Sequence, residues 1–197
     1  MNLRQRKRAA TRKKLATISL ELFLRDGFDE TTVESIAAIA EVSARTFFRY
    51  FPTKEAAFFD NQQSRLEAFV GLLDEPREGE SASDRVFRVC LEMADAFQQD
   101  SETMLAQYQV MFNSRHLLAH DLQLDLQWEE AIAKALAEGS QESEVQASAR
   151  MRAGAIIGVV RAELRHWYRS ECNFDIVERG QAAFAQLRSA NLGLPEA

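Results

Sequence analysis

Apolar residues recur every three or four positions through most of this chain, which is the spacing of one face of an α-helix. Near the N-terminus this stripe comprises Leu15, Ile18, Leu22 and Phe23. Gly27 follows it as a natural helix stop. Only three prolines and eight glycines interrupt 197 residues, which leaves little room for the turns of a β-protein. We therefore predict an all-α fold.

Three helices are predicted in the first 53 residues. The first runs from about Thr11 to Gly27. The second starts after Thr31 or Thr32, either of which can cap it. The third runs from about Ala44 to Phe51, because the following proline forces its neighbour out of the α region. Two short helices joined by a tight turn, the second of them basic, predict a helix-turn-helix.

The segment Ala44–Phe51 separates its side chains onto two faces. Phe47 and Phe51 fall together, four residues apart, which is typical of buried anchors. Arg45 and Arg49 fall on the opposite side, together with Thr46, Phe48 and Tyr50. Arginines beside aromatic rings in this position favour a surface that reads a DNA groove over an ordinary solvated face.

The net charge of −6 alone disfavours nucleic-acid binding, but its distribution reverses that conclusion. Residues 1–54 hold eleven bases and six acids, a net of +5, and the remainder of the chain carries −11. Residues 1–14 alone carry seven bases and no acid. They are interpreted as an arm that neutralises phosphates, with the first few residues a solvated tail.

Residues 11–56 resemble the DNA-binding head of the TetR family of bacterial transcriptional regulators, through the stretches ISLELFLRDGFDETTVESIAAIAEVS and ARTFFRYFPTKEA. The resemblance implies DNA contacts by Thr31 or Thr32, Ser43, Ala44, Arg45, Thr46, Phe48, Arg49, Tyr50 and Lys54. Lys54 and the threonine cap would hold phosphate, and Arg45 has the donors to read guanine. The chain departs from the family at Glu41, where glycine is usual, and at Phe48, where tyrosine is frequent.

Longer helices are predicted in the rest of the chain, near residues 54–74, 84–99, 102–113, 116–138, 142–169 and 174–191. The clearest loop is PREGESAS, which begins at Pro76. We therefore divide the chain into a helix-turn-helix DNA-binding domain over 1–53 and a helical ligand-binding and dimerisation domain over 54–197.

Small residues repeat at helical spacing in the penultimate helix: Ala147, Met151, Gly154, Gly158 and Ala162. Neighbouring arginines exclude a membrane span, and the longest apolar run has about eight residues where a span needs roughly 20. The last helix carries its own apolar stripe, Ile176, Val177, Ala183, Phe184 and Leu187. The resemblance implies a homodimer through these last two long helices, and packing within one chain is the alternative.

Aromatic and methionine side chains are spread over the middle helices. The resemblance places a ligand pocket among these helices, and methionine suits an adaptable apolar pocket. Phe97, Tyr108, Phe112 and Trp128 are the candidate lining residues. Membership of an ordinary core is the alternative for each of them.

Other site chemistry is weakly supported. His116 and His120 are four residues apart, but without an HExxH pattern a solvated pair is favoured over a metal site. No GxSxG, phosphate-binding glycine loop or Cys–His signature is present, so neither an enzyme nor a cofactor is predicted. Cys90 and Cys172 form no CxxC pair, and no signal-peptide core follows the N-terminal bases. A cytoplasmic protein with reduced thiols is expected.

Together these features predict a homodimeric TetR-type regulator that binds double-stranded operator DNA. By resemblance it is a repressor, released from a palindromic operator by a small, largely apolar effector. The alternatives are a constitutive DNA-binding protein without an inducer, and an enzyme carrying a helix-turn-helix head.

Overall fold

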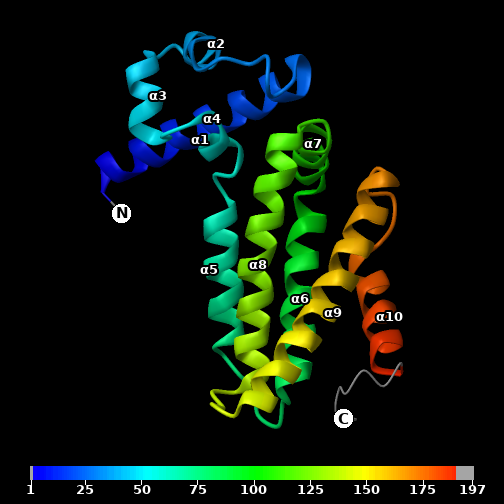
Figure 1. The fold of residues 1–197 in the computed structure, drawn as a ribbon. Coiled ribbons are helices and arrows are strands. Elements are labelled where there is room, and N and C mark those ends of the chain that lie inside the picture. The colour runs from blue at the N-terminus through cyan, green and yellow to red at the C-terminus, as the bar shows by residue number, and fades with distance from the viewer. Residues whose placement is uncertain (1, 190–197) are drawn as a thin grey trace. The chain divides into compact units, whose positions relative to one another are not determined.

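The computed structural model of this chain describes residues 2–189, which form ten α-helices (Figure 1). Their bounds are α1 Leu3–Asp26, α2 Val33–Ile39, α3 Ala44–Tyr50, α4 Lys54–Phe58, α5 Gln62–Leu73, α6 Ala82–Gln99, α7 Ser101–Phe112, α8 Arg115–Ala137, α9 Ser143–Arg169 and α10 Ile176–Ser189. No strand occurs among the described residues, so the predicted all-α class is confirmed. In this part of the chain, none of the helices combines the length and apolarity needed to cross a lipid bilayer.

Hydroxyl side chains cap three of the short helices. Thr32, Ser43 and Thr53 precede α2, α3 and α4. Each side-chain oxygen accepts a hydrogen bond from the backbone N–H three residues further on. A cap of this kind stabilises a helix by about 1 kcal/mol, because it satisfies an N–H group that has no partner within the helix.

The first helix begins at Leu3, earlier than the predicted start near Thr11, so the segment expected to be a solvated tail is helical from Leu3 onward, although it is exposed as expected. Asn2 caps the helix, and a reciprocal pair of hydrogen bonds of 2.8 and 2.9 Å joins Asn2 to Gln5. Alanine and the long basic side chains of this segment are strong helix formers. The apolar stripe marks only the part of α1 that faces the core, so it misses the N-terminal turns.

The helix expected over residues 54–74 is two helices, α4 and α5, interrupted at Phe59–Asn61. Phe59 leaves the helical region with φ −90° and ψ 20°, and its ring packs edge-on against Phe58 at 4.8 Å. Phe58 belongs to one core cluster and Phe69 of α5 to another. The break lets each helix face its own core. At the far end, predicted residues 190 and 191 of the last helix lie outside the described residues.

The backbone contacts divide the chain into two compact units. The first comprises the residues through Gln63 together with Ala106–Ala119. The second comprises Ser64–Leu105 together with the residues from His120 onward. All three helices of the predicted DNA-binding domain lie in the first unit, and the functional boundary after residue 53 stays a prediction.

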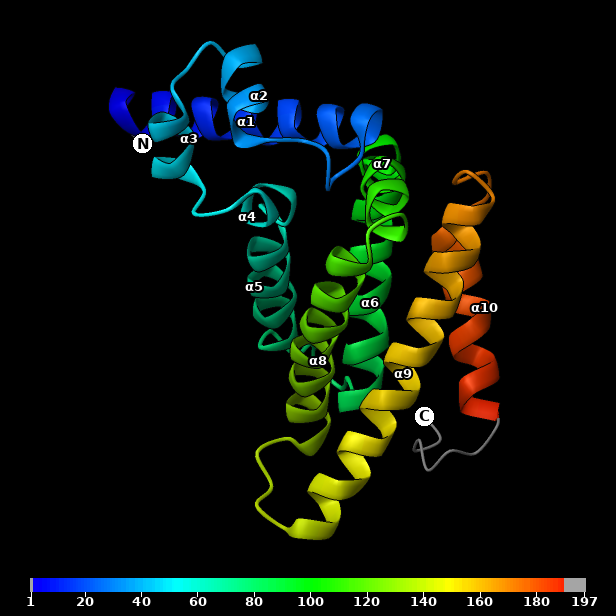
Figure 2. The same cartoon turned by 45° about the horizontal axis from the view of Figure 1, so that its top comes forward.

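The first unit is organised around α1, which packs against α2 and α4, while α3 packs against α2 (Figure 2). Phe47 and Phe51 are 0% exposed, and their ring centroids lie 5.6 Å apart. The prediction that they anchor the core is confirmed. The buried members of this cluster are Leu15, Leu22, Phe23, Phe28, Ile36, Ala40, Phe47, Phe51, Ala57, Phe58, Val110 and Leu117.

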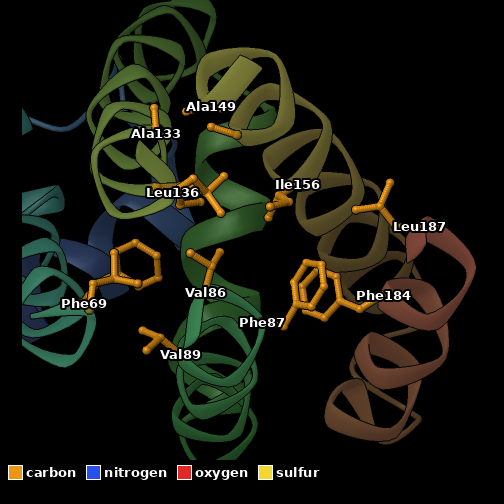
Figure 3. Packing of buried hydrophobic residues seen from close by; sticks show 13 residues of the cluster. Phe69, Val86, Phe87, Val89, Ala133, Leu136, Ala149, Ile156, Phe184 and Leu187 are labelled. Carbon is orange, nitrogen blue, oxygen red and sulfur yellow. The ribbon is translucent and has the colours of Figure 1, made fainter. Parts of the chain in front are cut away.

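In the second unit, α5, α6, α9, α10 and the larger part of α8 run side by side (Figure 1). Their shared core contains Val86 and Val89 of α6, both 0% exposed (Figure 3). Phe87 of α6 stacks on Phe184 of α10 with 4.6 Å between the ring centroids. Burying side chains of this size stabilises the fold by about 1.5–3 kcal/mol each. The stripe of α10 therefore packs within its own chain, at least through Phe184 and Leu187.

An ion-pair network fixes the loop between α5 and α6. Arg88 binds both carboxylate oxygens of Glu80, at 2.6 and 3.0 Å, and also donates to the carbonyl of Glu75. The side chains of Arg88 and Glu80 are 14% and 10% exposed. The hydrogen bonds from Arg88 lower the pKa of Glu80 to about 2. The loop that the sequence marks by its turn residues is therefore held closely against α6.

Candidate nucleic-acid interface

The turn between α2 and α3 contains a residue in an unusual backbone conformation. Glu41 has φ 59°, in the left-handed region that residues other than glycine adopt at a cost of about 1–2 kcal/mol. The turn is closed by hydrogen bonds from the N–H of Glu41 to Ala38 and from the N–H of Val42 to Ala37, at 3.1 and 2.9 Å. The tight turn therefore forms with a strained backbone at Glu41, where a glycine would have no such strain.

The first turn of α3 presents two hydroxyl groups. Ser43 accepts a hydrogen bond from the N–H of Thr46, and the two side-chain oxygens lie 3.0 Å apart. Ala44, between them, is half-buried. A helix N-terminus carries partial positive charge and free N–H groups, which suit a phosphate.

One edge of α3 is exposed along its whole length. Arg45, Phe48 and Arg49 are exposed, with half of the Phe48 side chain accessible to solvent. The Arg49 guanidinium lies 5.3 Å from the centre of the Tyr50 ring, which is half-buried. The two faces that the sequence predicts for this segment are therefore present: a buried face at Phe47 and a cationic, aromatic edge opposite to it.

The two threonines before α2 have different environments. Thr32 is exposed and caps the helix, whereas Thr31 is 4% exposed and its hydroxyl donates inward to the carbonyl of Gly27 at 2.7 Å. The alternative left open by the sequence is thereby reduced to Thr32 as the accessible hydroxyl. Thr31 fixes the loop that carries it.

Lys54, the predicted phosphate ligand, has several partners within the first unit. Its ammonium donates to the carbonyls of Phe28, Asp29 and Thr31 at 2.7, 3.2 and 3.2 Å. It also lies 4.4 Å from the centre of the Phe28 ring. Lys54 therefore stabilises the loop that leads into α2, and a phosphate contact by the same ammonium stays a prediction.

The sequence assigns all seven bases of residues 1–14 to one phosphate-binding arm. In the structure, two of them, Arg12 and Lys14, instead bind groups of the protein. Lys14 donates to the carbonyl of Ala40 at the end of α2, at 3.0 Å. Arg12 binds the end of α3 and Asp60. A signal for these roles exists in the sequence, because Arg12 lies on the line of Leu15, Ser19 and Leu22, which are the buried positions of α1. The other five bases, Arg4, Arg6, Lys7, Arg8 and Lys13, are exposed on α1.

The four candidate ligand-binding aromatics lie in separate surroundings. Phe97 packs beside the cluster of Met104 and Trp167, and Trp128 packs against Phe69 in the main core of the second unit. Tyr108 and Phe112, on the part of α7 in the first unit, stack on each other at 5.7 Å. A shared ligand site for the four stays a prediction.

A depression of about 440 Å³ opens on the surface between α6 and α10. Its lining residues are Arg88, Leu91, Glu92, Asp95 and Val177, so it includes none of the four aromatics.

Two half-buried carboxylates lie close to the predicted histidine pair in the sequence, in the second unit. Asp125 of α8 lies 3.1 Å from Arg161 of α9, and Asp121 stands one turn before Asp125. Burial and the neighbouring carboxylate of Asp125 raise the pKa of Asp121 to about 6.

His116 pairs with Glu55 at 3.4 Å and its ring lies parallel to Phe28. Within residues 2–189, no group of three or more His, Cys, Asp or Glu side chains is placed to hold a metal ion.

In the comparison with known proteins, this chain matches two family models. Residues 18–59 match the family described as bacterial regulatory proteins, tetR family, and residues 80–191 match the MftR C-terminal domain. A relative from Mycobacterium tuberculosis, named as a mycofactocin biosynthesis transcriptional regulator, MftR, is 29% identical over 181 residues. That alignment covers 91% of this chain and 90% of the relative.

Solved structures of regulators share the fold. NalD of Pseudomonas aeruginosa, the secondary repressor of the MexAB-OprM multidrug efflux pump, superposes with a TM-score of 0.70 at 17% identity, over 92% of this chain and 96% of NalD. FadR of Thermus thermophilus, a TetR-family transcriptional repressor in complex with lauroyl-CoA, superposes with a TM-score of 0.57 at 23% identity, over 94% of this chain and 97% of FadR. The predicted architecture, a helix-turn-helix head on a helical body, is confirmed at the level of the fold.

Proposed function

This chain belongs to the TetR family of bacterial regulatory proteins, and we propose that it is a homodimeric repressor that a small, largely apolar ligand releases from a palindromic operator. The observation that carries the DNA-binding part is the edge of α3. It presents Arg45 and Arg49 to solvent directly after a serine-capped turn. An exposed, basic second helix of a helix-turn-helix is the element that enters a major groove.

In the proposed complex the residues of this edge divide into two groups. Arg45 reads the O6 and N7 atoms of a guanine, at about 1–3 kcal/mol of discrimination, and Ala44 and Thr46 lie over neighbouring base edges. The hydroxyls of Thr32 and Ser43, with Arg49 and Tyr50, position the helix on the phosphates. Phe48 adds an apolar contact to the groove wall.

The exposed bases of α1 add sequence-independent affinity. The first 54 residues carry +5 and the remaining residues −11, so the N-terminal residues are attracted to the duplex and the rest of the chain is repelled from it. Each phosphate neutralised by Arg4, Arg6, Lys7, Arg8 or Lys13 releases counterions and steepens the salt dependence by about one unit per contact.

The exposed face of α9 supports the proposed dimer. Ala147, Met151, Gly158 and Ala162 are exposed along one side of this helix, and 63% of Met151 is accessible. Gly154 instead faces α8, where an added Cβ would meet the Glu129 carboxylate at 3.6 Å. A stripe of small residues around an exposed methionine permits a second copy of α9 to approach closely, while the outer side of α10 completes the interface.

The ligand part of the proposal rests on residues 54–197, the predicted ligand-binding domain. Its helices carry the aromatic residues Phe97, Tyr108, Phe112 and Trp128, and the structural neighbour FadR is a repressor in complex with lauroyl-CoA. A ligand that binds the body more tightly when the two heads cannot reach adjacent grooves shifts the population away from DNA. By linkage, operator DNA weakens ligand binding by the same factor.

Binding-site selection from a random duplex library tests the DNA part. We expect the wild-type dimer to select a two-fold symmetric sequence whose half-sites lie about one helical turn apart. Selection of no sequence, or of a single asymmetric site by a monomer, contradicts this part of the proposal.

The ligand part is tested with lauroyl-CoA as the probe and free coenzyme A as its control. The proposal expects lauroyl-CoA to weaken binding of the selected duplex, and the duplex to weaken binding of lauroyl-CoA by an equal factor. If the selected duplex binds equally well with every acyl and hydrophobic probe, the constitutive DNA-binding alternative is favoured.

A further inference from the structure

The side chain of Arg12 joins three segments of the first unit. Its Nη1 donates to the carbonyl of Tyr50, the last residue of α3, at 2.9 Å. Its Nε and Nη2 bind one oxygen of Asp60, at 2.6 and 2.5 Å. The guanidinium also lies 4.5 Å from the centre of the Phe51 ring.

Each of these contacts satisfies a group that would otherwise be under-bonded. The carbonyl of Tyr50 belongs to the last turn of a helix, where carbonyls have no partner within the helix and the helix dipole favours a cation. Asp60 lies in the break between α4 and α5, and its side chain is only 14% exposed. A guanidinium is suited to this position because its planar fork can serve an acid and a carbonyl at the same time.

Arg12 therefore differs from the exposed bases nearer the N-terminus of α1, for which no partner is seen among the described residues. Arg8, one turn earlier, is exposed and remains available to a phosphate. Arg12 uses three of its five N–H donors on Tyr50 and Asp60, and these bonds fix the orientation of its guanidinium.

We propose that Arg12 is a positioning residue for DNA recognition, which together with Asp60 holds the C-terminal end of the recognition helix α3 to the α4–α5 break. This inference rests on the proposed DNA-binding function and assigns to Arg12 and Asp60 a role that neither has in reading bases.

Substituting Asp60 distinguishes the positioning role from a purely electrostatic effect, because the two predict opposite changes in DNA affinity. Removing a negative charge from a DNA-binding head should strengthen binding to a polyanion. Asp60→Asn leaves the Arg12 guanidinium without its acid partner, so the positioning role predicts weaker binding. Glu30→Gln is the matched control, since Glu30 is an exposed acid of the same unit and its loss should strengthen binding slightly.

The experiment measures fluorescence anisotropy of two labelled duplexes at several salt concentrations. One duplex is the sequence that the wild-type protein selects from a random library, and the other is a scrambled sequence of equal length. We expect Arg12→Ala and Asp60→Asn each to weaken the selected duplex about tenfold, since lost charge-assisted hydrogen bonds have this magnitude. Binding of the scrambled duplex should change by less than about twofold. The double variant should bind no more weakly than Arg12→Ala alone, because both changes break one interaction.

The salt dependence supplies the contrast with a phosphate contact. Arg8→Ala should weaken both duplexes equally and reduce the slope of log K against log salt by about one. Arg12→Ala should leave that slope unchanged. A reduced slope with equal weakening of both duplexes for Arg12→Ala, or tighter binding by Asp60→Asn, overturns the inference.

Two measurements distinguish loss of the positioning contact from partial unfolding and from failure of the proposed DNA-binding function. A partly unfolded head would lose affinity for both duplexes by one factor, which a positioning role does not predict. If the wild-type protein selects no sequence, the proposed function fails, and hydrogen exchange of the free protein then decides about Arg12. Asp60→Asn should speed exchange of the amides of Phe51 and Gln62, which bond to Phe47 and Phe59, and leave α9 unchanged. Unchanged exchange at Phe51 and Gln62 overturns the inference as well.

Discussion

Replacing Glu41 with glycine should stabilise the protein. Glu41 lies in the helix-turn-helix turn with φ 59°, and its side chain is exposed. The left-handed conformation costs a residue with a Cβ about 1–2 kcal/mol, and glycine adopts it without that cost. Glycine in turn gives the unfolded chain more freedom, which offsets about 0.4–1 kcal/mol. The expected net gain in the free energy of unfolding is about 0.5–1 kcal/mol.

The assay is urea and thermal unfolding followed by circular dichroism, with Glu41→Ala as the matched control. Alanine removes the same carboxylate but keeps the Cβ and therefore the backbone strain. For a chain of this size, a gain of 1 kcal/mol corresponds to a rise in Tm of about 2–4 °C. We expect this rise for glycine and a change within about 0.5 kcal/mol for alanine. A glycine variant no more stable than the alanine variant would show that the strain at φ 59° has been overestimated.

Three further outcomes are expected. Lys54→Met should lower the free energy of unfolding by about 1–3 kcal/mol, because carbonyls of the loop before α2 lose a charged donor, and urea unfolding measures this loss. If the same variant also reduces the slope of log K for DNA against log salt by about one, Lys54 contacts a phosphate as well. The Glu80–Arg88 pair should contribute stability above the ordinary carboxyl pKa and lose it as the pH falls from about 4.5 toward about 2, because the folded protein lowers the pKa of Glu80. Glu80→Gln should remove that acid-dependent loss from a urea titration repeated across this pH window, and an unchanged pH profile would contradict the assignment. Met151→Glu on the exposed side of α9 should shift the protein from dimer to monomer in analytical ultracentrifugation, because like charges would meet at the proposed interface; an intact dimer would place the interface elsewhere.

The helix-turn-helix could be predicted closely because its signals are local. A threonine or serine cap, an i, i+4 pair of phenylalanines and a proline act within a few residues of each other, and Thr32, Ser43, Phe47 and Phe51 have the expected positions. The same locality explains the helix starts of the second unit, which agree with the prediction to within about two residues.

Features that depend on contacts between distant segments could not be predicted. The break between α4 and α5 reflects two cores, one containing Phe58 and one containing Phe69, and residues 54–74 read as one helix without that information. Likewise, a run of bases in residues 1–14 does not reveal that Arg12 and Lys14 are bound to carbonyls more than twenty residues away. Charge and spacing predict a surface, but the partner of each base follows from the tertiary fold.

Predicted ligand residues show the same limit. Aromatic side chains at helical spacing do not all mark buried positions, because Trp128 packs against Phe69 whereas Phe112 is 53% exposed. Whether such a side chain lines a cavity or fills a core is decided by the helices opposite to it, which the spacing does not encode.

Binding-site selection with Arg45→Ala tests most directly the claim that α3 reads DNA. The wild-type protein and Arg8→Ala should select the same two-fold symmetric sequence, with Arg8→Ala weaker and less salt-dependent. Arg45→Ala should lose the preference at one base pair in each half-site, at a cost of about 1–3 kcal/mol for binding the original sequence. A selection profile that Arg45→Ala leaves unchanged at every position would contradict the account.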